Sequence, residues 1–408
     1  MLTIEEALAA VRERTSPLPC SRTLLGDALG MVLGENVESD IDIPPFDKAL
    51  MDGYAVRGED IKGGSGRLLV VEEILAGKLP TRTIGVGEAA AIMTGAPMPG
   101  GADSVVVVEM TRREGGEVVI EDPSFAPGKH LMRRGREMRA GERVLQAGVL
   151  LNSVKLGLLA AVGRAKVTMV SRPRVAILAT GDELVEPGQV PGPGQIRNSN
   201  ATMLRALARN AGAEVELLPI ARDEMGELRG ALGRGLKADV LLVTGGVSAG
   251  NRDLVPEALH GLGVERVFHK IRMKPGKPLW FGVGKSRTGG AAGPLVFGLP
   301  GNPVSGVVGF MVFVRPALEG LSGREARWDR TIGARLGSSF RHVGDRPTYY
   351  PSRVESGGLD GKLAVVNPLA WGGSADLRTV AGADGFVVFE AGNREYQAGE
   401  IVRFLGLE

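Results

Sequence analysis

The stretch Asp239-Val240-Leu241-Leu242-Val243-Thr244-Gly245-Gly246 decides the fold of the longest part of this chain. Its continuous apolar run indicates a strand buried on both faces, which is typical of a parallel sheet. The two glycines that follow indicate a tight turn at the carboxyl end of that strand.

The same order of strand, marked loop and helix recurs on both sides of this stretch. The predicted strands cover residues 174–179, 214–219, 239–244, 266–272 and 295–297. The predicted helices cover residues 200–211, 224–236, a segment from about 253, and 303–318. Strands that alternate with helices predict a doubly wound, mostly parallel α/β domain.

The chain outside this domain has a different texture. Thr3 and Glu6 form a capping-box pattern that predicts an N-terminal helix, and further helices are predicted around 21–33 and 153–162. Short β-like runs broken by Gly and Pro predict an inserted β-rich domain and a small C-terminal β domain. The predicted division is an N-terminal helical region of residues 1–42 and 146–172, a β-rich domain of 43–145, an α/β domain of 173–322 and a C-terminal β domain of 323–408.

Cysteine and histidine are scarce in this sequence. The 408 residues include one cysteine, Cys20, and four histidines, which excludes an internal disulfide, a Cys-type zinc site and an iron–sulfur cluster. Any metal must therefore be held by oxygen ligands, which favours Mg²⁺. Glycine fills 61 positions without a collagen period and among apolar runs, which indicates many special backbone conformations rather than disorder.

Charge and hydropathy indicate which kinds of partner the protein does not bind. The 49 Lys and Arg residues nearly balance the 47 Asp and Glu residues, so the formal net charge of +2 does not suit a dedicated nucleic-acid binder. The N-terminal string MLTIEEALAAVRERT is acidic and amphipathic, unlike a signal peptide. No apolar run approaches the ~20 residues of a membrane span. These features predict a cytoplasmic protein that binds neither nucleic acid nor membrane.

Four loops marked by glycine or proline follow predicted strands of the α/β domain. Ligands bind at the carboxyl ends of the strands in such sheets, so these loops predict a ligand site. Glycine turns present backbone N–H groups that suit a phosphate or another oxyanion. The predicted ligand-binding glycines are Gly181, Gly245, Gly246, Gly250, Gly276 and Gly301.

Charged side chains accompany these loops. Lys274 and Lys277 add point charges for the same anionic ligand. Glu183, Asp223 and Asp253 offer hard oxygen ligands for Mg²⁺. Carboxylates beside lysines and anion-binding loops predict a metal-assisted site for a phosphorylated substrate.

Each of these features also has a purely structural interpretation. A strand-end glycine is commonly a simple turn, Asp253 would serve as a helix cap, and Lys274 as a solvated side chain. Pro300 and Pro303 fit turn punctuation, with Pro303 at a helix start. The convergence of four such loops on one sheet edge favours the ligand site.

The β-rich domain contains two further motifs and a basic stretch. Asp52 lies in the string MDGYAVR and Thr94 in the string MTGAPMP, and each motif alone is typical of a turn. Five arginines between residues 129 and 143 are typical of a solvated face. The functional interpretation of this stretch is a rim that attracts anions.

The chain resembles the molybdopterin molybdenumtransferase family, whose eukaryotic relatives include the E domain of gephyrin. The resemblance rests on an ordered series of strings, PPFD, MDGYAVR, MTGAPMP, TGDEL, IRNSN, GGVSAGNRD, MKPGKP and GLPGNPVS. It spans essentially the whole chain, and the ordered set is far more specific than any one string. It implies that molybdenum from molybdate is inserted into adenylated molybdopterin, with a divalent metal such as Mg²⁺, hydrolysis of the adenylate and release of AMP.

The resemblance also implies roles for residues. Asp52 and Thr94 are expected to line the site from the β-rich domain, and Asp253 to serve the metal and adenylate hydrolysis with Glu183 or Asp223 assisting. Lys274 and Lys277 are expected to hold anionic groups of the ligands. The other substrate-binding residues that the resemblance implies are Ser248, Pro300, Pro303 and Ser305 in the α/β domain and, for molybdate, Arg346, Ser374 and Thr379 in the C-terminal domain.

Family resemblance further predicts the partners. Members form elongated homodimers in which the β-rich domain of one subunit faces the α/β domain of the other. We therefore expect a homodimer with dimerisation through the helical region, and a contact with the molybdopterin adenylyltransferase.

Two stretches depart from the family pattern. Lys48-Ala49-Leu50 stands where the family usually has Asn-Ser-Ala, so a hydroxyl is missing. Arg134-Gly135-Arg136-Glu137 stands where the family has Arg-Gly-Glu-Asp, so a carboxylate survives only at Glu137. These departures bear on inter-domain contacts and leave the proposed metal and lysine positions intact.

Two other functions compete with this interpretation. A molybdopterin adenylyltransferase shares the α/β fold, but a lone α/β domain suffices for its reaction. A non-catalytic clustering scaffold is the second alternative, and the intact carboxylates and lysines argue against it.

Overall fold

The computed structural model describes residues 1–247, 254–286, 292–356 and 363–407. The chain forms two compact units. Unit 1 comprises Met1–Thr23, Gly30–Gly34 and Thr168–Glu408, and unit 2 comprises Leu24–Leu29 and Glu35–Val167.

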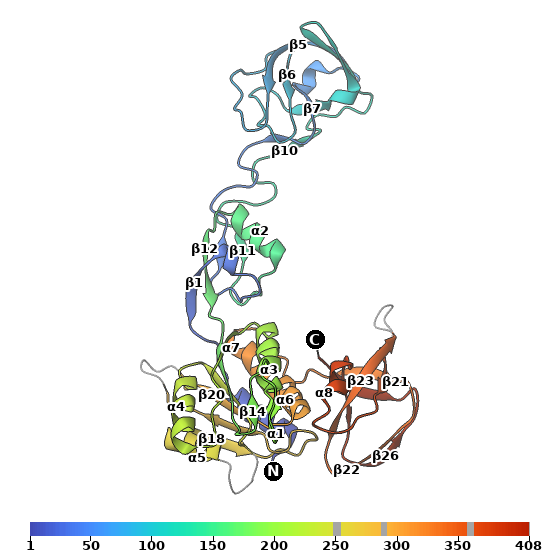
Figure 1. The fold of residues 1–408 in the computed structure, drawn as a ribbon. Helices are drawn as coiled ribbons and strands as arrows, with labels where there is room; N and C mark the ends of the chain where they lie inside the picture. The colour runs from blue at the N-terminus through green and yellow to red at the C-terminus, as the bar shows by residue number, and fades with distance from the viewer. Residues whose placement is uncertain (248–253, 287–291, 357–362, 408) are drawn as a thin grey trace. The chain divides into compact units, whose positions relative to one another are not determined.

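A six-stranded sheet forms the centre of unit 1, in the order β16-β13-β17-β20-β19-β18 (Figure 1). Its first four strands are parallel to one another, and β19 pairs antiparallel with both of its neighbours, β20 and β18. The strands are β16 Glu214–Leu217, β13 Arg174–Ala179, β17 Val240–Thr244, β20 Leu295–Leu299, β19 Trp280–Val283 and β18 Glu265–His269. The predicted mostly parallel α/β sheet is confirmed, with β19 as an additional strand. A short parallel pair, β14 Leu184–Val185 and β15 Ile196–Arg197, lies outside this sheet.

Helices cover both faces of the sheet because its central strands are apolar on both sides. In β13, Val175 and Ile177 pack in one core cluster, while Ala176 and Leu178 pack in a second. The helices of the first cluster are α1 Ile4–Arg12, α3 Ser199–Asn210, α6 Pro303–Gly309 and α7 Arg315–Leu321, with a π-helical turn, η4 Phe310–Val314, between the last two. The second cluster holds α4 Met225–Gly235 and α5 Leu254–Gly261.

Helix α1 belongs to the α/β core of unit 1, whereas the predicted division places it with residues 146–172. The cause is its apolar stripe of Ile4, Ala7 and Val11, which is buried in the first cluster. Its capping box is present as predicted, with Thr3 and Glu6 each bonded to the backbone of the other.

One helical stretch, Pro303–Leu321, is long and apolar enough to cross a membrane by length and composition. We expected no apolar run near the ~20 residues of a membrane span, and this helix of 19 residues comes close to that length. Within the fold, 89% of its apolar window is buried, so it acts as the core helix of the α/β domain.

The C-terminal part of unit 1 is a closed β-barrel, β21-β24-β23-β25-β27, with a separate two-stranded pair, β22-β26. The predicted small C-terminal β domain is thereby confirmed, although it also contains α8, a short helix absent from the sequence analysis. The elements are β21 Ile332–Leu336, β22 Phe340–Gly344, β23 Thr348–Ser356, β24 Val365–Pro368, α8 Leu377–Ala381, β25 Gly385–Phe389, β26 Gly392–Tyr396 and β27 Ile401–Gly406.

Unit 2 is built on a six-stranded sheet in the order β7-β4-β6-β5-β9-β8, which confirms the predicted β-rich region. Its strands are β4 Gly53–Val56, β5 Ser65–Ile74, β6 Glu88–Ile92, β7 Ser104–Val107, β8 Thr111–Glu114 and β9 Glu117–Glu121. The remaining elements of the unit are β2 Val37–Glu38 paired with β11 Arg143–Leu145, β3 Lys48–Ala49 paired with β10 Leu131–Met132, helix α2 Ser153–Ala161, and the 3₁₀ turns η1 Leu25–Asp27, η2 Gly58–Asp60 and η3 Val108–Met110.

The helix predicted around residues 21–33 is wrong. The structure has strand β1 Cys20–Leu24, which pairs with β12 Lys166–Val170, and then the short turn η1. Ser and Thr side chains disfavour a helix interior and Thr favours a strand, so tertiary pairing with β12 determines this segment.

Candidate active site

Three neighbouring parallel strands end together at one edge of the α/β sheet. Thr180 follows β13, Gly245 follows β17 and Pro300 follows β20. Backbone bonds join these ends, because the N–H of Thr180 donates to the carbonyl of Thr244 (2.9 Å) and the N–H of Gly245 donates to the carbonyl of Leu299 (3.2 Å). The three loops that follow are therefore held side by side at the carboxyl edge, where such sheets bind ligands.

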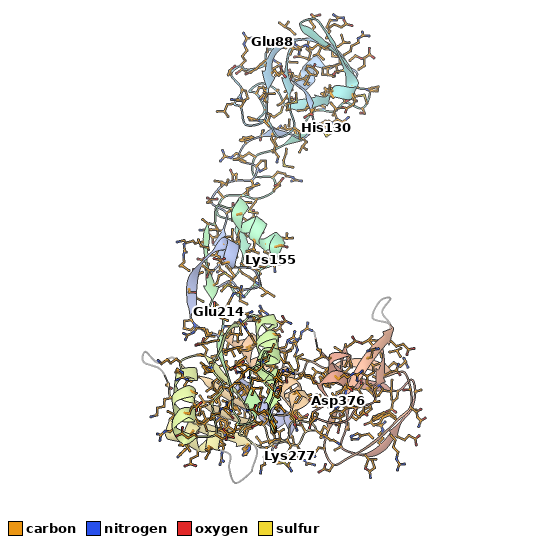
Figure 2. All side chains as sticks on the ribbon, viewed as in Figure 1. Glu88, His130, Lys155, Glu214, Lys277 and Asp376 are labelled. Carbon is orange, nitrogen blue, oxygen red and sulfur yellow. The ribbon has the colours of Figure 1, made fainter. Side chains whose placement is uncertain are left out.

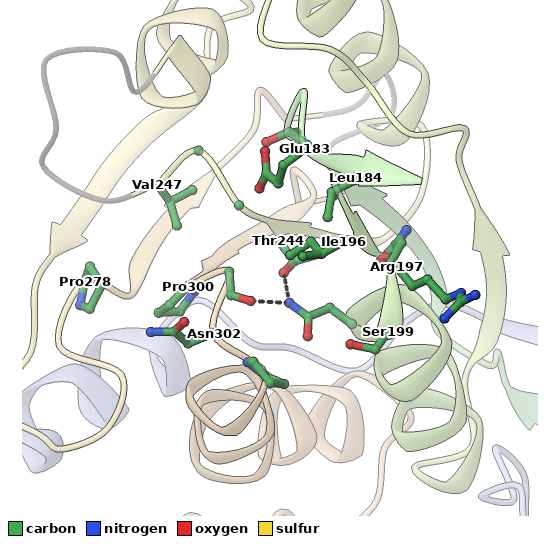
Figure 3. Close-up of a pocket in the computed structure, with 17 residues that line it drawn as sticks. Glu183, Leu184, Ile196, Arg197, Ser199, Thr244, Val247, Pro278, Pro300 and Asn302 are labelled. Atoms are coloured by element: carbon green, nitrogen blue, oxygen red, sulfur yellow. Dashed lines mark hydrogen bonds between the residues drawn. The ribbon is translucent and has the colours of Figure 1, made fainter. Parts of the chain in front are cut away.

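A pocket of about 410 Å³, which we name the sheet-edge pocket, opens at these loops (Figure 3). Among its lining residues are six that the sequence analysis singled out, Glu183, Gly245, Gly246, Pro300, Gly301 and Pro303. Leu184, Ile196 and Val247 supply apolar walls, and Thr180, Thr244 and Asn200 supply polar groups. Apolar walls with a few placed polar groups suit a flat heterocyclic ligand.

The glycine turn of this pocket admits no side chain. Gly245 has a φ of +94°, and a Cβ there would lie 2.3 Å from the carbonyl oxygen of Thr180. Gly246 has a φ of +60°, and a Cβ there would lie 2.8 Å from Val255. The backbone can therefore approach a ligand closely at this turn.

The amino end of helix α3 also borders the sheet-edge pocket. Asn198 caps this helix, because its side-chain oxygen accepts from the N–H of Ala201 (3.1 Å). Ser199 and Asn200, the first residues of the helix, line the pocket. The positive end of the helix dipole thus favours a phosphate in the pocket.

A second cavity of about 240 Å³, which we name the two-lysine pocket, lies between the α/β domain and the C-terminal barrel within unit 1. Figure 2 labels Lys277 on the first of these parts and Asp376 on the second. The pocket's predicted lining residues are Lys274, Gly276, Lys277, Pro300, Ser305, Arg346 and Ser374. Its lining also includes Asn302 and Trp371, which the sequence analysis did not single out.

The two-lysine pocket is rich in positive charge. In the part of the chain that the structure describes, no carboxylate oxygen lies within 4.0 Å of the Nζ of Lys274 or Lys277. Arg346 pairs with Asp345 (3.1 Å) and also donates to the carbonyl of Met273 (3.3 Å), which fixes its guanidinium at the pocket. Two lysines that form no ion pair within 4.0 Å with the described residues, beside an arginine, suit a small oxyanion.

Backbone bonds fix the segment that carries the lysines. The N–H of Lys274 donates to the carbonyl of Pro347 (2.9 Å), and the N–H of Tyr349 donates to the carbonyl of Lys274 (2.8 Å). These bonds join the α/β domain to strand β23 of the barrel. The barrel therefore positions one wall of the two-lysine pocket.

The metal site predicted from Glu183, Asp223 and Asp253 is only partly described. Asp253 lies outside the described residues, as do Ser248 and Gly250. Among the residues that the structure describes, no three Asp, Glu, His or Cys side chains gather closely enough to hold a metal ion. Mg²⁺ is commonly held by one or two carboxylates together with substrate phosphates, so Glu183 at the pocket wall fits such a site.

Two further residues bear on this carboxylate region. The N–H of Asp223 donates to the side chain of Asp182 (3.3 Å), which joins the loop after β16 to the loop after β13. Gly181 is buried beneath Glu183, because a Cβ there would lie 2.4 Å from a Glu183 carboxylate oxygen. Gly181 therefore gives the Glu183 side chain its room.

In unit 2, Asp52 and Thr94 contact each other directly. The backbone N–H and the hydroxyl of Thr94 donate to Asp52 Oδ1, at 2.6 Å and 2.7 Å. These bonds, the backbone one first, lower the pKa of the Asp52 carboxyl. The two motifs thus form one exposed carboxylate site, and their expected part in catalysis stays a prediction.

Two of the five arginines in the basic stretch of unit 2 form ion pairs. Arg133 pairs with Asp47 (2.7 Å) and Arg134 with Asp42 (2.6 Å). The two departures from the family pattern meet here, because Lys48 Nζ lies 3.9 Å from the carboxylate of Glu137. The lysine and the retained carboxylate therefore form a pair of their own.

Thr379 lines neither of the two pockets as far as the structure describes them. Its backbone N–H and hydroxyl donate to Asp376, at 3.0 Å and 2.7 Å, where Asp376 caps helix α8. Its predicted contact with molybdate has no support in this geometry.

Nearly the whole chain is similar to known proteins of a single family. Residues 2–163 match the MoeA N-terminal region (domain I and II), residues 176–320 a probable molybdopterin binding domain, and residues 333–407 the MoeA C-terminal region (domain IV). The molybdopterin molybdenumtransferase of Staphylococcus aureus (strain Mu50) is 32% identical over 406 residues, which cover 98% of this chain and 94% of that protein. This chain belongs to the molybdopterin molybdenumtransferase family.

Other members of the molybdopterin molybdenumtransferase family support the assignment. The enzyme of that name from Staphylococcus epidermidis (strain ATCC 35984) is also 32% identical over 98% of this chain and 94% of its own. A crystal structure of the molybdopterin biosynthesis MoeA protein from Pyrococcus horikosii has a TM-score of 0.82 at 32% identity, covering 100% of this chain and 99% of that one. The multidomain fold of the family is therefore the fold of this chain.

Several polar residues of this family member's pockets were missed by the sequence analysis. Thr180 and Thr244 end buried strands, and Asn200 lies next to a capping residue, so each resembles an ordinary element boundary. Trp371 packs its ring edge-on to Tyr350, with centroids 5.3 Å apart, and reads from sequence as a core residue. The signal that could have indicated Thr180 and Thr244 is a polar residue at the carboxyl end of a buried strand.

A buried histidine behind the two-lysine pocket makes stability depend on pH. His342 Nδ1 bonds the carbonyl of Gly392 (3.2 Å) and Nε2 bonds the hydroxyl of Thr348 (2.9 Å). Burial lowers the pKa of His342 from its ordinary 6.5, and the charge of Lys274 lowers it further. Below pH 6.5 the unfolded chain therefore takes up a proton that the folded chain does not, and stability falls as the pH falls.

Denaturant unfolding of the wild type and of His342→Gln at pH 8, 6.5 and 5.5 checks this prediction. The free energy of unfolding of the wild type should fall more between pH 6.5 and 5.5 than that of the variant. Parallel curves for the two proteins would show that His342 does not carry the effect.

Proposed function

We propose that this chain inserts molybdenum into molybdopterin, with adenylated molybdopterin and molybdate as substrates. The observation that carries the proposal is the pair of adjoining pockets. The sheet-edge pocket combines apolar walls with a glycine turn and a helix amino end, which suits a heterocycle and its phosphates. The two-lysine pocket suits a small oxyanion such as molybdate. The relatives of this chain are named for the same transfer.

In the proposed reaction a water molecule breaks the phosphoanhydride bond of the adenylate, so AMP leaves and molybdopterin keeps its own phosphate. The two dithiolene S–H groups of molybdopterin bind molybdenum and give up their protons, which convert the displaced molybdate oxygen to water without a change in the oxidation state of the metal. Lys274 and Lys277 hold the molybdate, and the Gly245–Gly246 turn holds phosphate oxygens. Asp253 is the proposed residue for metal binding and hydrolysis, with Glu183 or Asp223 assisting. A bound Mg²⁺ would withdraw charge from the phosphoanhydride.

Restoration of molybdoenzyme activity in insertase-deficient cells tests the function. We expect the wild type to restore activity with molybdate in the medium, and a parallel culture with tungstate measures the preference for the metal. Asp253→Asn should fail to restore it. Failure of the wild type would instead favour the clustering scaffold, and ATP turnover on unadenylated molybdopterin would favour the adenylyltransferase.

We further propose that the protein works as a cytoplasmic homodimer that contacts the adenylyltransferase for substrate transfer. An apolar surface on helix α2 of unit 2 supports the dimer. Only Leu159 of the nine residues of α2 is buried, and Val154 is 77% exposed. Leu24 and Leu29 flank η1, which packs beside α2, and are 55% and 54% exposed. Exposed apolar side chains on or beside two elements that contact each other favour a surface that a second subunit covers.

Replacing Val154 with glutamate is expected to shift the native mass from dimer to monomer. A charge in an apolar interface is desolvated without a partner, which costs several kcal/mol. Light scattering on the purified protein measures the mass. Val86→Glu is the matched control, because Val86 is also 77% exposed but lies in a loop of the β-rich sheet. A dimeric Val154→Glu protein would place the interface elsewhere.

A further inference from the structure

The sheet-edge pocket and the two-lysine pocket share one wall. Pro278, Pro300 and Asn302 line both cavities. Pro300 and Asn302 belong to one short loop, which runs from strand β20 to helix α6. The position of that loop therefore shapes both binding sites at once.

Asn200 fixes this loop from the side of the sheet-edge pocket. Its side-chain Nδ2 donates to Thr244 Oγ1 (2.9 Å) and to the carbonyl oxygen of Gly301 (2.7 Å), as the dashed lines in Figure 3 show. One amide group thus ties the first turn of helix α3 to the end of strand β17 and to the shared loop. The carbonyl of Gly301 only accepts, so the amide has to present its nitrogen to it.

This arrangement leaves the other half of the amide without a partner. Asn200 Oδ1 is buried and makes no hydrogen bond in the part of the chain that the structure describes. A buried acceptor without a partner is unfavourable, and each such group calls for an explanation. Holding the loop at Gly301 explains why the amide keeps this orientation.

The C-terminal barrel holds the same loop from the opposite side. Asn302 Nδ2 donates to Ser374 Oγ (2.9 Å), and the N–H of Val304 donates to the carbonyl of Ser374 (3.1 Å). The loop is therefore held between Asn200 on the α/β side and Ser374 on the barrel side. Loss of either attachment leaves the wall of both pockets free to shift.

We propose that Asn200 is a positioning residue for oxyanion binding in the two-lysine pocket, which it does not line. It acts through the shared loop by bonding Gly301, next to Pro300 and Asn302. The proposal rests on the proposed function, because it takes molybdate as the ligand of that pocket. A residue that only contacts a ligand affects binding in its own pocket alone. Asn200 should affect binding in both pockets, although it lines only the sheet-edge pocket.

Titration calorimetry with molybdate alone and with AMP alone, on the full-length protein, tests the proposal. We expect Asn200→Ala to weaken binding of both probes by at least about fivefold, although only the sheet-edge pocket contains Asn200. Asn200→Asp keeps the size of the side chain but removes both donors, and it should weaken molybdate binding to a similar degree. Asn210→Ala, at the exposed end of the same helix, should bind both probes like the wild type.

Melting temperatures within about 4 °C of the wild type verify that the variants are folded. If one variant is unfolded, the other carries the test. Molybdate affinity within twofold of the wild type in a folded variant would overturn the proposal, whether or not AMP binding falls. A wild type that binds neither probe would contradict the proposed function itself and would leave Asn200 no site to position.

Discussion

Replacing Lys277 with alanine is expected to weaken molybdate binding about 10- to 100-fold. Hydrogen bonds to charged groups contribute about 1.5–3 kcal/mol, and each ~1.4 kcal/mol is a factor of ten in affinity. Lys277 lines the two-lysine pocket, and no described carboxylate lies within 4.0 Å of its Nζ. Its positive charge is therefore available to the oxyanion, and alanine removes that charge. Titration calorimetry with molybdate measures the loss, and Lys274→Ala should behave in the same way.

AMP binding should be nearly unchanged in the Lys277 variant, because Lys277 does not line the described sheet-edge pocket. Lys78→Ala is the matched control, since it removes the same charge from an exposed turn of the β-rich domain. If Lys277→Ala and Lys78→Ala bind molybdate equally well, the assignment of the oxyanion to this pocket is wrong.

Replacing Gly245 with alanine is expected to lower the rate of molybdenum insertion about 100-fold, because a misplacement near 1 Å in an active site has an effect of this size. The added Cβ would lie 2.3 Å from the carbonyl oxygen of Thr180, and the φ of +94° disfavours any side chain. The turn must then move away from the end of strand β13. AMP affinity and the insertion rate measure the consequence.

Gly188→Ala serves as the control for the Gly245 variant. Gly188 has no heavy atom within 4 Å of an added Cβ, and its φ is not in the left-handed region. We expect this variant to match the wild type in rate and melting temperature. A Gly245→Ala protein as active as Gly188→Ala would show that the close approach of this turn to the ligand is not required.

The α/β sheet was predictable because its signal is local. Strand β17 is a run of five buried residues that ends at Gly245, and both the run and the glycine are visible in the sequence. Strand β19 is only four residues long, pairs antiparallel with β20 and has no helix between itself and that strand, so no alternation of strand and helix indicates it. The segment around 21–33 became a strand through pairing with distant β12, which no local pattern reports.

The candidate site divides in the same way. Gly245, Lys274 and Lys277 were predictable because glycine turns and lysines in a proline-rich loop are recognisable at single positions. Asn200 and Trp371 were not predictable from the sequence. Asn200 matters because it bonds Gly301, which lies 101 residues further along the chain. Trp371 matters because the fold places it in the lining of the two-lysine pocket. For Thr379 the family position suggests a ligand contact, the structure shows a helix-cap bond to Asp376, and the suggested contact stays a prediction.

AMP release measured with and without molybdate shows whether adenylate hydrolysis is coupled to molybdenum insertion. The purified protein is mixed with adenylated molybdopterin and Mg²⁺, and AMP is quantified as molybdate is added. We expect AMP to appear only with molybdate, one AMP for each molybdenum inserted. AMP release at the same rate without molybdate, or insertion without AMP release, would contradict it.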